Sequence, residues 1–224
     1  MIRAIIFGVD GVLVHPMVFS RVLARDHGLT IEDTAGFFEG PFKRCLCGEA
    51  DLKAELPRYL KERGWPNSLE DFLGRWLEAD SEVNREMLDL ATRARQNGKL
   101  CYIASTQERY RASYLEKELG FGSMFDGLFF SCRVGCQKPE PEFYEVVSNE
   151  VGFEPGELLF FDDVHENVTA ARAAGWNAEA YTIGMEVSGV AAKYAFFANR
   201  SIKWHYDAAT AIRQLWGRSS HGDD

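Results

Sequence analysis

The sequence lacks the long apolar stretch that a membrane-spanning helix requires. Hydrophobic residues make up 46% of the 224-residue chain, yet no run approaches the roughly 20 consecutive apolar residues that cross a bilayer. The first apolar run, residues 4–7, is soon followed by Asp10 and is too short for a signal peptide with a cleavage site. We therefore expect a soluble, cytoplasmic protein with one large domain, or one domain with a second inserted into it.

Basic charge is also scarce. The 25 Lys and Arg residues face 34 Asp and Glu residues, which gives a formal net charge of -9 and a pI of about 5.1. Such a surplus of negative charge repels the phosphate backbone of nucleic acids and anionic lipid surfaces. The composition therefore argues against nucleic acid or membrane as a partner and favours a small molecule or a protein. The oligomeric state cannot be predicted from the sequence.

Cysteine is sparse and odd in number. The chain has Cys45, Cys47, Cys101, Cys132 and Cys136, and an odd number without a secretion signal fits reduced thiols better than a disulfide framework. The two close pairs, 45 with 47 and 132 with 136, do not have the usual spacing of zinc-finger ligands. We therefore do not expect a metal site built from cysteines.

Short apolar runs alternate with amphipathic stretches in the first and last parts of the chain, which predicts an α/β fold with a parallel sheet. The expected strands are residues 3–8, 99–104, 128–131, 158–162 and 178–182. The long segment between the first two has helical spacing instead, and Ser68 is the predicted cap of a helix that begins at Leu69. Because this segment is too long for an ordinary connection, we predict a core of residues 1–14 and 96–216, an inserted helical domain of residues 15–95, and a loose tail of residues 217–224.

Polar residues follow the expected strands at the ends where open parallel sheets bind ligands. A hydroxyl at a helix N-terminus suits a phosphoryl oxygen, and adjacent acids at a strand end suit a hard cation. Each group also has an ordinary structural alternative, as a helix cap, a turn residue or a solvated lysine. The candidates are Asp10, Gly11, Ser105, Thr106, Lys138, Asp162 and Asp163.

Taken in order, these motifs resemble the four motifs of the haloacid dehalogenase (HAD) superfamily. The resemblance covers the chain apart from its tail, and the inserted helices match the cap that this superfamily carries between its first two motifs. It implies a Rossmann-like three-layer core and Mg-dependent phosphoryl transfer through an aspartyl-phosphate intermediate. The matching residues are Asp10-Gly11-Val12-Leu13, Ser105, Lys138-Pro139-x-Pro141, and Asp162-Asp163 with Asn167 and the Ala-rich run that ends at Gly175.

The resemblance also implies roles for these residues. Asp10 would act as general acid and then as general base, as two successive half-reactions require. Lys138 would assist catalysis and bind phosphate together with Ser105, Thr106 and Gly11. Mg would be held by the backbone carbonyl of Asp10 and by Asp162 or Asp163, with Asn167 behind them.

Position 8 departs from the superfamily pattern. The superfamily has a nucleophilic aspartate where this chain has Gly8, so the nucleophile and one metal ligand are both missing. Three explanations are open: a phosphatase altered at this one position, a natural pseudoenzyme that binds a phosphorylated ligand or a protein partner without turnover, or a glycine needed by the strand together with a misleading resemblance.

The retained site residues favour the first explanation. We expect a phosphatase scaffold for a small phosphorylated metabolite, with activity lost or strongly impaired by Gly8. A phosphomutase stays open, and a dehalogenase fits worse because carbon–halogen displacement needs neither Mg nor these acids.

The inserted helices would select the substrate. The side chains of Phe37, Phe38, Phe42, Lys43 and Arg44 could face the site, but aromatic residues are usually buried, and we expect these to form the core of the inserted domain. His15, directly after the first motif, is a candidate hinge residue.

Overall fold

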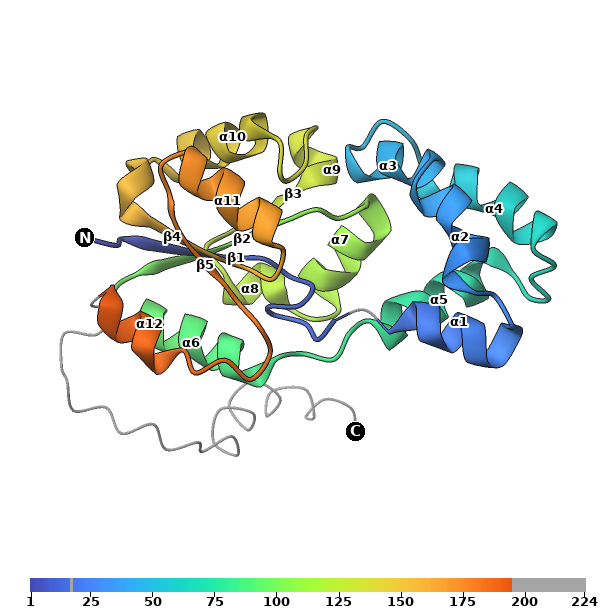
Figure 1. Ribbon diagram of the computed structural model, residues 1–224, viewed down its shortest axis with the longest axis horizontal. Coiled ribbons are helices and arrows are strands. Elements are labelled where there is room, and N and C mark those ends of the chain that lie inside the picture. Colours follow the sequence, from blue (N-terminus) through green and yellow to red (C-terminus); the bar gives the residue numbers. More distant parts are fainter. Residues whose placement is uncertain (17, 195–224) are drawn as a thin grey trace, which may run out of the picture.

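The computed structural model describes residues 1–16 and 18–194 (Figure 1). Its five-stranded sheet is parallel throughout and has the order β3-β2-β1-β4-β5. The strands lie within two residues of the predicted ranges: β1 (Ala4–Phe7), β2 (Leu100–Ser105), β3 (Gly127–Phe130), β4 (Leu158–Asp162) and β5 (Asn177–Ala180). The predicted α/β class is therefore confirmed. The tail, residues 217–224, and the predicted core beyond residue 194 lie outside the described residues.

Helices make up most of the rest of the described chain. Between β1 and β2 lie α1 (Phe19–His27), α2 (Ile31–Phe38), α3 (Pro41–Leu46), α4 (Leu52–Glu62), α5 (Leu69–Ala79) and α6 (Arg85–Gln96). After β2 follow α7 (Arg109–Lys117), α8 (Phe121–Met124), α9 (Ser131–Val134), α10 (Pro141–Val151), the short 3-10 helix η1 (Pro155–Glu157), α11 (His165–Ala173) and α12 (Ser188–Lys193).

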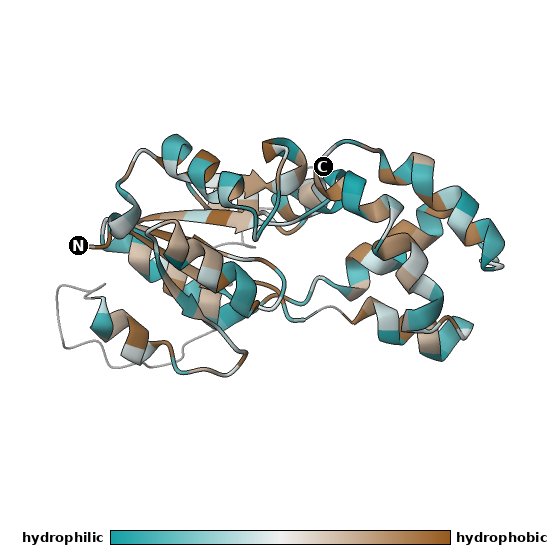
Figure 2. Cartoon of the chain, turned by 45° about the horizontal axis from the view of Figure 1, so that its top comes forward, coloured by the Kyte–Doolittle hydropathy of each residue, from teal (hydrophilic) through white to brown (hydrophobic). Residues whose placement is uncertain are grey.

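The sheet is buried on both faces because successive residues of each strand point to opposite sides. In β1, Ile5 and Phe7 pack with α6, α7, α8 and α12. Ala4 and Ile6 pack with α10 and α11 on the other face. Strands covered on both sides have nearly continuous apolar sequences, and Figure 2 shows them largely brown, with hydrophilic residues along the outer helices.

The helices α1 to α5, which we call the cap helices, form a core of their own. Phe72 and Trp76 are buried there among other aromatic rings. Helix α6 instead places Met87 and Leu90 in the core cluster on the face of the sheet that carries Ile5 and Phe7. The predicted domain limits, residues 1–14 with 96–216 and residues 15–95, remain a prediction. This packing joins α6 to the sheet, although all of α6 except its last residue falls within residues 15–95.

Local sequence signals account for several features of the cap helices. Ser68 caps α5, since its hydroxyl oxygen accepts a hydrogen bond of 3.0 Å from the backbone N–H of Asp71, and this prediction is confirmed. Phe37 is buried and stacks on Tyr59, with Phe38 and Phe42 packed against the same cluster. The aromatic residues thus form the core of the cap helices, as predicted.

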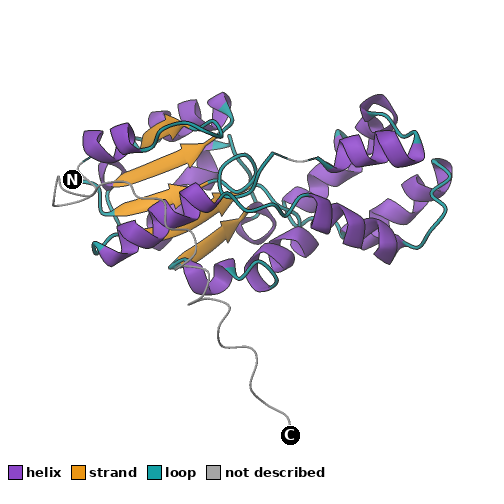
Figure 3. Cartoon of the chain, turned by 90° about the horizontal axis from the view of Figure 1, so that it is seen from below, coloured by secondary structure: helices purple, strands orange, loops and turns teal. Residues whose placement is uncertain are grey.

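The carboxyl ends of the strands point toward the cap helices, as the arrowheads in Figure 3 show. The loops that leave β1, β2 and β4 therefore meet between the sheet and these helices, where the predicted site residues lie. None of the described helices is both long and apolar enough to traverse a lipid bilayer.

Candidate active site

Gly8 lies immediately after β1, and its backbone N–H donates to the carbonyl of Phe161 at 2.8 Å. A Cβ atom at this position would stand 2.8 Å from Oδ2 of Asp162 and 3.3 Å from the Phe161 carbonyl oxygen. The carboxylate of Asp162 thus lies directly beside the glycine. Any side chain at position 8 would require that carboxylate to shift.

Gly11 allows the chain to turn sharply away from β1. Its φ of 72° is left-handed, a region that glycine enters without strain. A Cβ here would be only 2.1 Å from Oδ2 of Asp163, so Gly11 also makes room for the second acid of the pair. The sequence prediction that Gly11 binds phosphate remains a prediction.

Lys138 and Asp162 form a buried ion pair across the site. Their side chains are 5% and 2% exposed, and Nζ of Lys138 donates to Oδ2 of Asp162. The other oxygen of Asp162, Oδ1, accepts hydrogen bonds from Nδ2 of Asn167 at 2.8 Å and from the backbone N–H of Val164 at 3.0 Å. The ammonium also lies 5.1 Å from the ring centroid of Phe160, so packing and hydrogen bonds both fix the pair.

Asp10 belongs to a second polar network with α7 and its approach loop. Its Oδ2 accepts a 2.6 Å hydrogen bond from Nε2 of Gln107, which also donates to Oγ of Ser105 at 3.0 Å. Its Oδ1 pairs with Nη2 of Arg111 at 2.8 Å. The structure therefore connects Asp10 and Ser105 through Gln107, a residue to which the sequence analysis gave no role.

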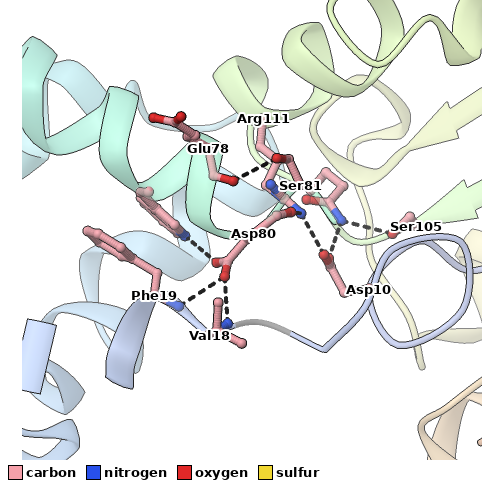
Figure 4. A network of polar contacts seen from close by, with 10 residues as sticks. Asp10, Val18, Phe19, Glu78, Asp80, Ser81, Ser105 and Arg111 are labelled. Carbon is pink, nitrogen blue, oxygen red and sulfur yellow. Dashed lines mark hydrogen bonds and ion pairs between the residues drawn. The ribbon is translucent and has the colours of Figure 1, made fainter. Parts of the chain in front are cut away.

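Arg111 carries this network to the linker between the cap helices and the core (Figure 4). Its Nη2 also donates to the backbone carbonyl of Asp80 at 2.6 Å. The buried carboxylate of Asp80 accepts from the backbone N–H groups of Val18 and Phe19, at 2.6 and 2.9 Å, and from the indole N–H of Trp76. Asp80 thus joins the two chain segments that enter and leave the cap helices, and Arg111 ties them to Asp10.

The linkers also pair with each other beside His15. The backbone N–H of His15 donates to the carbonyl of Glu82 at 2.8 Å, and Val14 forms an antiparallel bridge with Val83. His15 therefore lies in the linker where it was predicted, while its role as a hinge stays a prediction.

The cap helices contact the core at α9. The buried hydroxyl of Ser131 donates to the carbonyl of Leu46 at 2.6 Å and accepts from the backbone N–H of Gln107 at 2.9 Å. Nearby, a Cβ at Gly48 would be 2.3 Å from the carbonyl oxygen of Cys132. Backbone from the cap side and backbone from the core side therefore approach each other closely at this point.

A second contact joins α4 to α7. The hydroxyl of Tyr110 donates to both carboxylate oxygens of Asp51, at 2.9 and 3.0 Å, and Arg109 pairs with the same acid at 3.2 Å. Burial tends to raise the pKa of Asp51, but the hydrogen bonds from Tyr110 and from backbone N–H groups, with the charge of Arg109, lower it overall.

Two acids near the site have raised pKa values. Loss of hydration raises the pKa of Asp163, and the neighbouring Asp162 carboxylate adds to this effect, while Lys138 opposes it. Burial likewise raises the pKa of Glu108, which caps α7 by accepting from the backbone N–H groups of Tyr110 and Arg111. The charged form of each of these two carboxyl groups is therefore less favourable here than in water.

Two of the acids that would hold Mg, Asp10 and Asp162, are already engaged. Both oxygens of Asp162 and both oxygens of Asp10 accept hydrogen bonds from N–H donors, and position 8 supplies no carboxylate. Within residues 1–16 and 18–194, no group of three or more His, Cys, Asp or Glu side chains could hold a metal ion. A divalent cation prefers several oxygen ligands, so the donor set of this chain does not fit it.

Comparison with known proteins identifies the family. The sequence profile of haloacid dehalogenase-like hydrolases matches residues 2–175. The chain belongs to this family. The explanation of Gly8 as a strand residue in a misleading match is therefore wrong, whereas the roles predicted for the individual HAD motif residues stay predictions.

Two curated relatives are similar over most of this HAD chain. Bifunctional epoxide hydrolase 2 of Sus scrofa is 25% identical over 197 residues, which cover 78% of this chain and 35% of the relative. The chain thus spans about a third of the length of the first relatives that it matches. The phosphorylated carbohydrates phosphatase of Thermotoga maritima is 28% identical over 185 residues, 77% of this chain and 82% of the relative.

Solved HAD structures share the fold. One is a HAD family enzyme of Bacteroides thetaiotaomicron, an aspartate-to-alanine mutant in complex with magnesium and inorganic phosphate. It superposes with a TM-score of 0.72 at 20% identity and covers 85% of this chain and 99% of that chain. This likeness confirms the α/β core with its helical insertion after β1.

The structure brings together most of the residues that the sequence singled out. Lys138, Asp162 and Asn167 are in direct contact, and Asp10 reaches Ser105 through Gln107. The sequence analysis missed Arg111 and Asp80. Arg111 had a signal, because it lies four residues before the buried Leu115 on the same face of α7, whereas no pattern indicated Asp80.

Proposed function

We propose that this chain has the scaffold of a Mg-dependent HAD phosphatase and binds a small phosphorylated metabolite with little or no turnover. The observation that carries the proposal is the end of β1. There, Gly8 takes the place of the family's nucleophile and lies beside an otherwise retained set of groups, including the buried Lys138–Asp162 pair.

Relatives support the phosphate ligand. The Thermotoga maritima relative is named as a phosphatase of phosphorylated carbohydrates, and the Bacteroides thetaiotaomicron enzyme was solved with inorganic phosphate. By analogy, this chain would take a phosphate group between the ends of β1, β2 and β4. The cap helices would then face the organic part of the ligand, as an inserted cap does in this family.

Different residues of the site would have different roles toward the phosphate group. The ammonium of Lys138 and the hydroxyl of Ser105 would bind phosphoryl oxygens, with Thr106 beside them. Asp10 would be the general acid and base of the active scaffold, but with Gly8 no group is in place to attack phosphorus, because glycine has no side chain. Binding contacts survive such a loss, whereas covalent catalysis does not.

A binding assay beside a turnover assay tests the proposal. We expect inorganic phosphate to bind the chain in calorimetry, and we expect hydrolysis of phosphomonoesters at least roughly 10³-fold slower than by Gly8→Asp. The matched control is Asp10→Asn in both backgrounds, which should abolish the activity of Gly8→Asp only. Rapid turnover by the parent chain that persists in Asp10→Asn would contradict the proposal, as would a failure to bind phosphate.

A further inference from the structure

We propose that the site at the end of β1, beside Gly8, binds its phosphate group without a divalent cation, with the ammonium of Lys138 supplying the positive charge that faces the ligand. This inference rests on the proposed function, since it concerns how the same ligand is held. It separates this chain from the magnesium chemistry of the active scaffold.

The first argument is the state of the acceptors. Asp162 accepts two hydrogen bonds at Oδ1 and the Lys138 ammonium at Oδ2, and it is 1% exposed. Asp10 accepts from Gln107 at one oxygen and from Arg111 at the other. A metal at Asp10 and Asp162 would therefore have to displace cationic or amide donors from both acids. Asp163, whose pKa is raised by loss of hydration and by the neighbouring Asp162, would be left as a single acidic ligand, without a carboxylate at position 8 to compensate.

The second argument is the state of the donors. Lys138 has three N–H groups, and its hydrogen bond to Asp162 uses one of them. The hydroxyl of Ser105 accepts from Gln107 and keeps its own O–H to donate. The buried Oγ1 of Thr106 has no hydrogen-bond partner among the described residues. Spare donors beside engaged acceptors suit an anion rather than a cation.

The third argument is charge. A carboxylate at position 8 would stand next to Asp162, and two adjacent carboxylates need a cation between them. With Gly8, the ammonium of Lys138 lies beside one carboxylate, that of Asp162, instead of two. Arg111 pairs with Asp10 at 2.8 Å. The loss of one negative charge removes both a metal ligand and the repulsion that a metal would relieve.

Phosphate binding with and without Mg tests this directly. Coupling between two ligands is reciprocal, so a bridging metal would tighten phosphate binding by the same factor by which phosphate tightens metal binding. We expect the calorimetric affinity of the full chain for inorganic phosphate to differ by less than about twofold between EDTA and Mg at matched ionic strength. An affinity tenfold or more higher in Mg would overturn the inference.

Three variants make the comparison sharper. Gly8→Asp should bind phosphate tightly only with Mg. Gly8→Asn meets the same steric contacts without the charge, and its phosphate affinity should be the same in EDTA and in Mg. The double variant Lys138→Met with Asp162→Asn removes the ion pair without leaving a buried acid alone, and it should lose phosphate affinity at least tenfold while keeping its circular dichroism spectrum. If this folded double variant binds phosphate as well as the parent, Lys138 does not supply the charge and the inference fails.

A titration with Mg alone separates this inference from the proposed function. Should phosphate bind in neither buffer, the proposed function fails, and the Mg titration still decides the metal question. We expect no saturable Mg binding by the parent chain. Saturable binding that disappears in Asp162→Asn would show a metal beside Asp162 and would overturn the inference.

Discussion

Replacing Gly8 by aspartate is the most informative change in this chain, because it adds one carboxylate at the end of β1. The new Cβ would approach Oδ2 of Asp162 to 2.8 Å and the Phe161 carbonyl oxygen to 3.3 Å. The Asp162 side chain must therefore shift before the new carboxylate is accommodated. We expect the shift to loosen the Lys138–Asp162 ion pair and to leave Lys138 between two acids.

The cost follows from the geometry. Two carboxylates about 4 Å apart repel by about 4 kcal/mol at an effective dielectric constant of 20, and Lys138 offsets part of this. Removing a strand glycine returns about 0.5–1 kcal/mol. We expect a net loss of about 2–3 kcal/mol without Mg, which corresponds to a Tm lower by roughly 4–12 °C for a chain of this size. Mg at 100 times its Kd should restore about 2.7 kcal/mol.

The assay combines thermal melts with hydrolysis of a panel of phosphomonoesters, each with Mg and with EDTA. Gly8→Asn is the matched control, because it meets the same contacts without adding charge. Aspartate and asparagine should therefore differ in Tm without Mg, and only the aspartate variant should gain stability and phosphatase activity with Mg.

Two results would refute this reasoning. Equal melting temperatures of the two variants in EDTA would show that charge repulsion beside Asp162 is not significant. An aspartate variant that stays inert across the panel and gains no stability from Mg would show that the rest of the site is not that of a phosphatase.

Three further changes test other parts of the structure. Asp80→Ala removes the acceptor of three N–H groups in the linker and should lower the free energy of unfolding by about 2–4 kcal/mol in urea titrations; a loss below about 0.5 kcal/mol would contradict this role. Ser131→Ala removes the hydroxyl between Leu46 and Gln107 and should lower the free energy of unfolding by about 1–2 kcal/mol. It should also speed limited proteolysis of the cap helices, whereas unchanged cleavage would show that this contact does not hold them. Because burial raises the pKa of Glu108 in the folded state, its contribution to stability is complete below the unfolded pKa and is lost as the pH rises through the folded pKa. The unfolding free energy of the parent chain minus that of Glu108→Gln should thus fall as the pH rises above the ordinary glutamate pKa of about 4.3, and a rise would have the wrong sign.

The strands and the cap of α5 could be predicted from the sequence because their causes are local. Strands buried on both faces leave continuous apolar runs such as that of β4, and a serine cap acts within one turn of its helix. The side of the sheet on which a helix packs is not a local property. The amphipathic pattern of α6 therefore marked it as a helix without indicating that Met87 and Leu90 face the sheet.

The site residues likewise include some that could be predicted from the sequence and some that could not. Ordered motifs at strand ends identified Lys138 and Asp162 because the topology of a parallel sheet brings such ends together. The contacts of Arg111 with Asp10 and Asp80 join residues 101 and 31 positions apart, and they depend on how the linker crosses α7. A sequence pattern carries no information about that crossing.

Gly48 determines how the two parts of the chain meet. At this position, the backbone after α3 lies against the backbone of α9. Even a methyl group would collide there, because a Cβ at Gly48 would be 2.3 Å from the carbonyl oxygen of Cys132. The contact of the cap helices with α9 thus combines this close approach of two backbone segments with the hydrogen bond from the Ser131 hydroxyl to the Leu46 carbonyl. Any residue larger than glycine at position 48 would therefore push the cap helices away from α9 and from the ends of the strands.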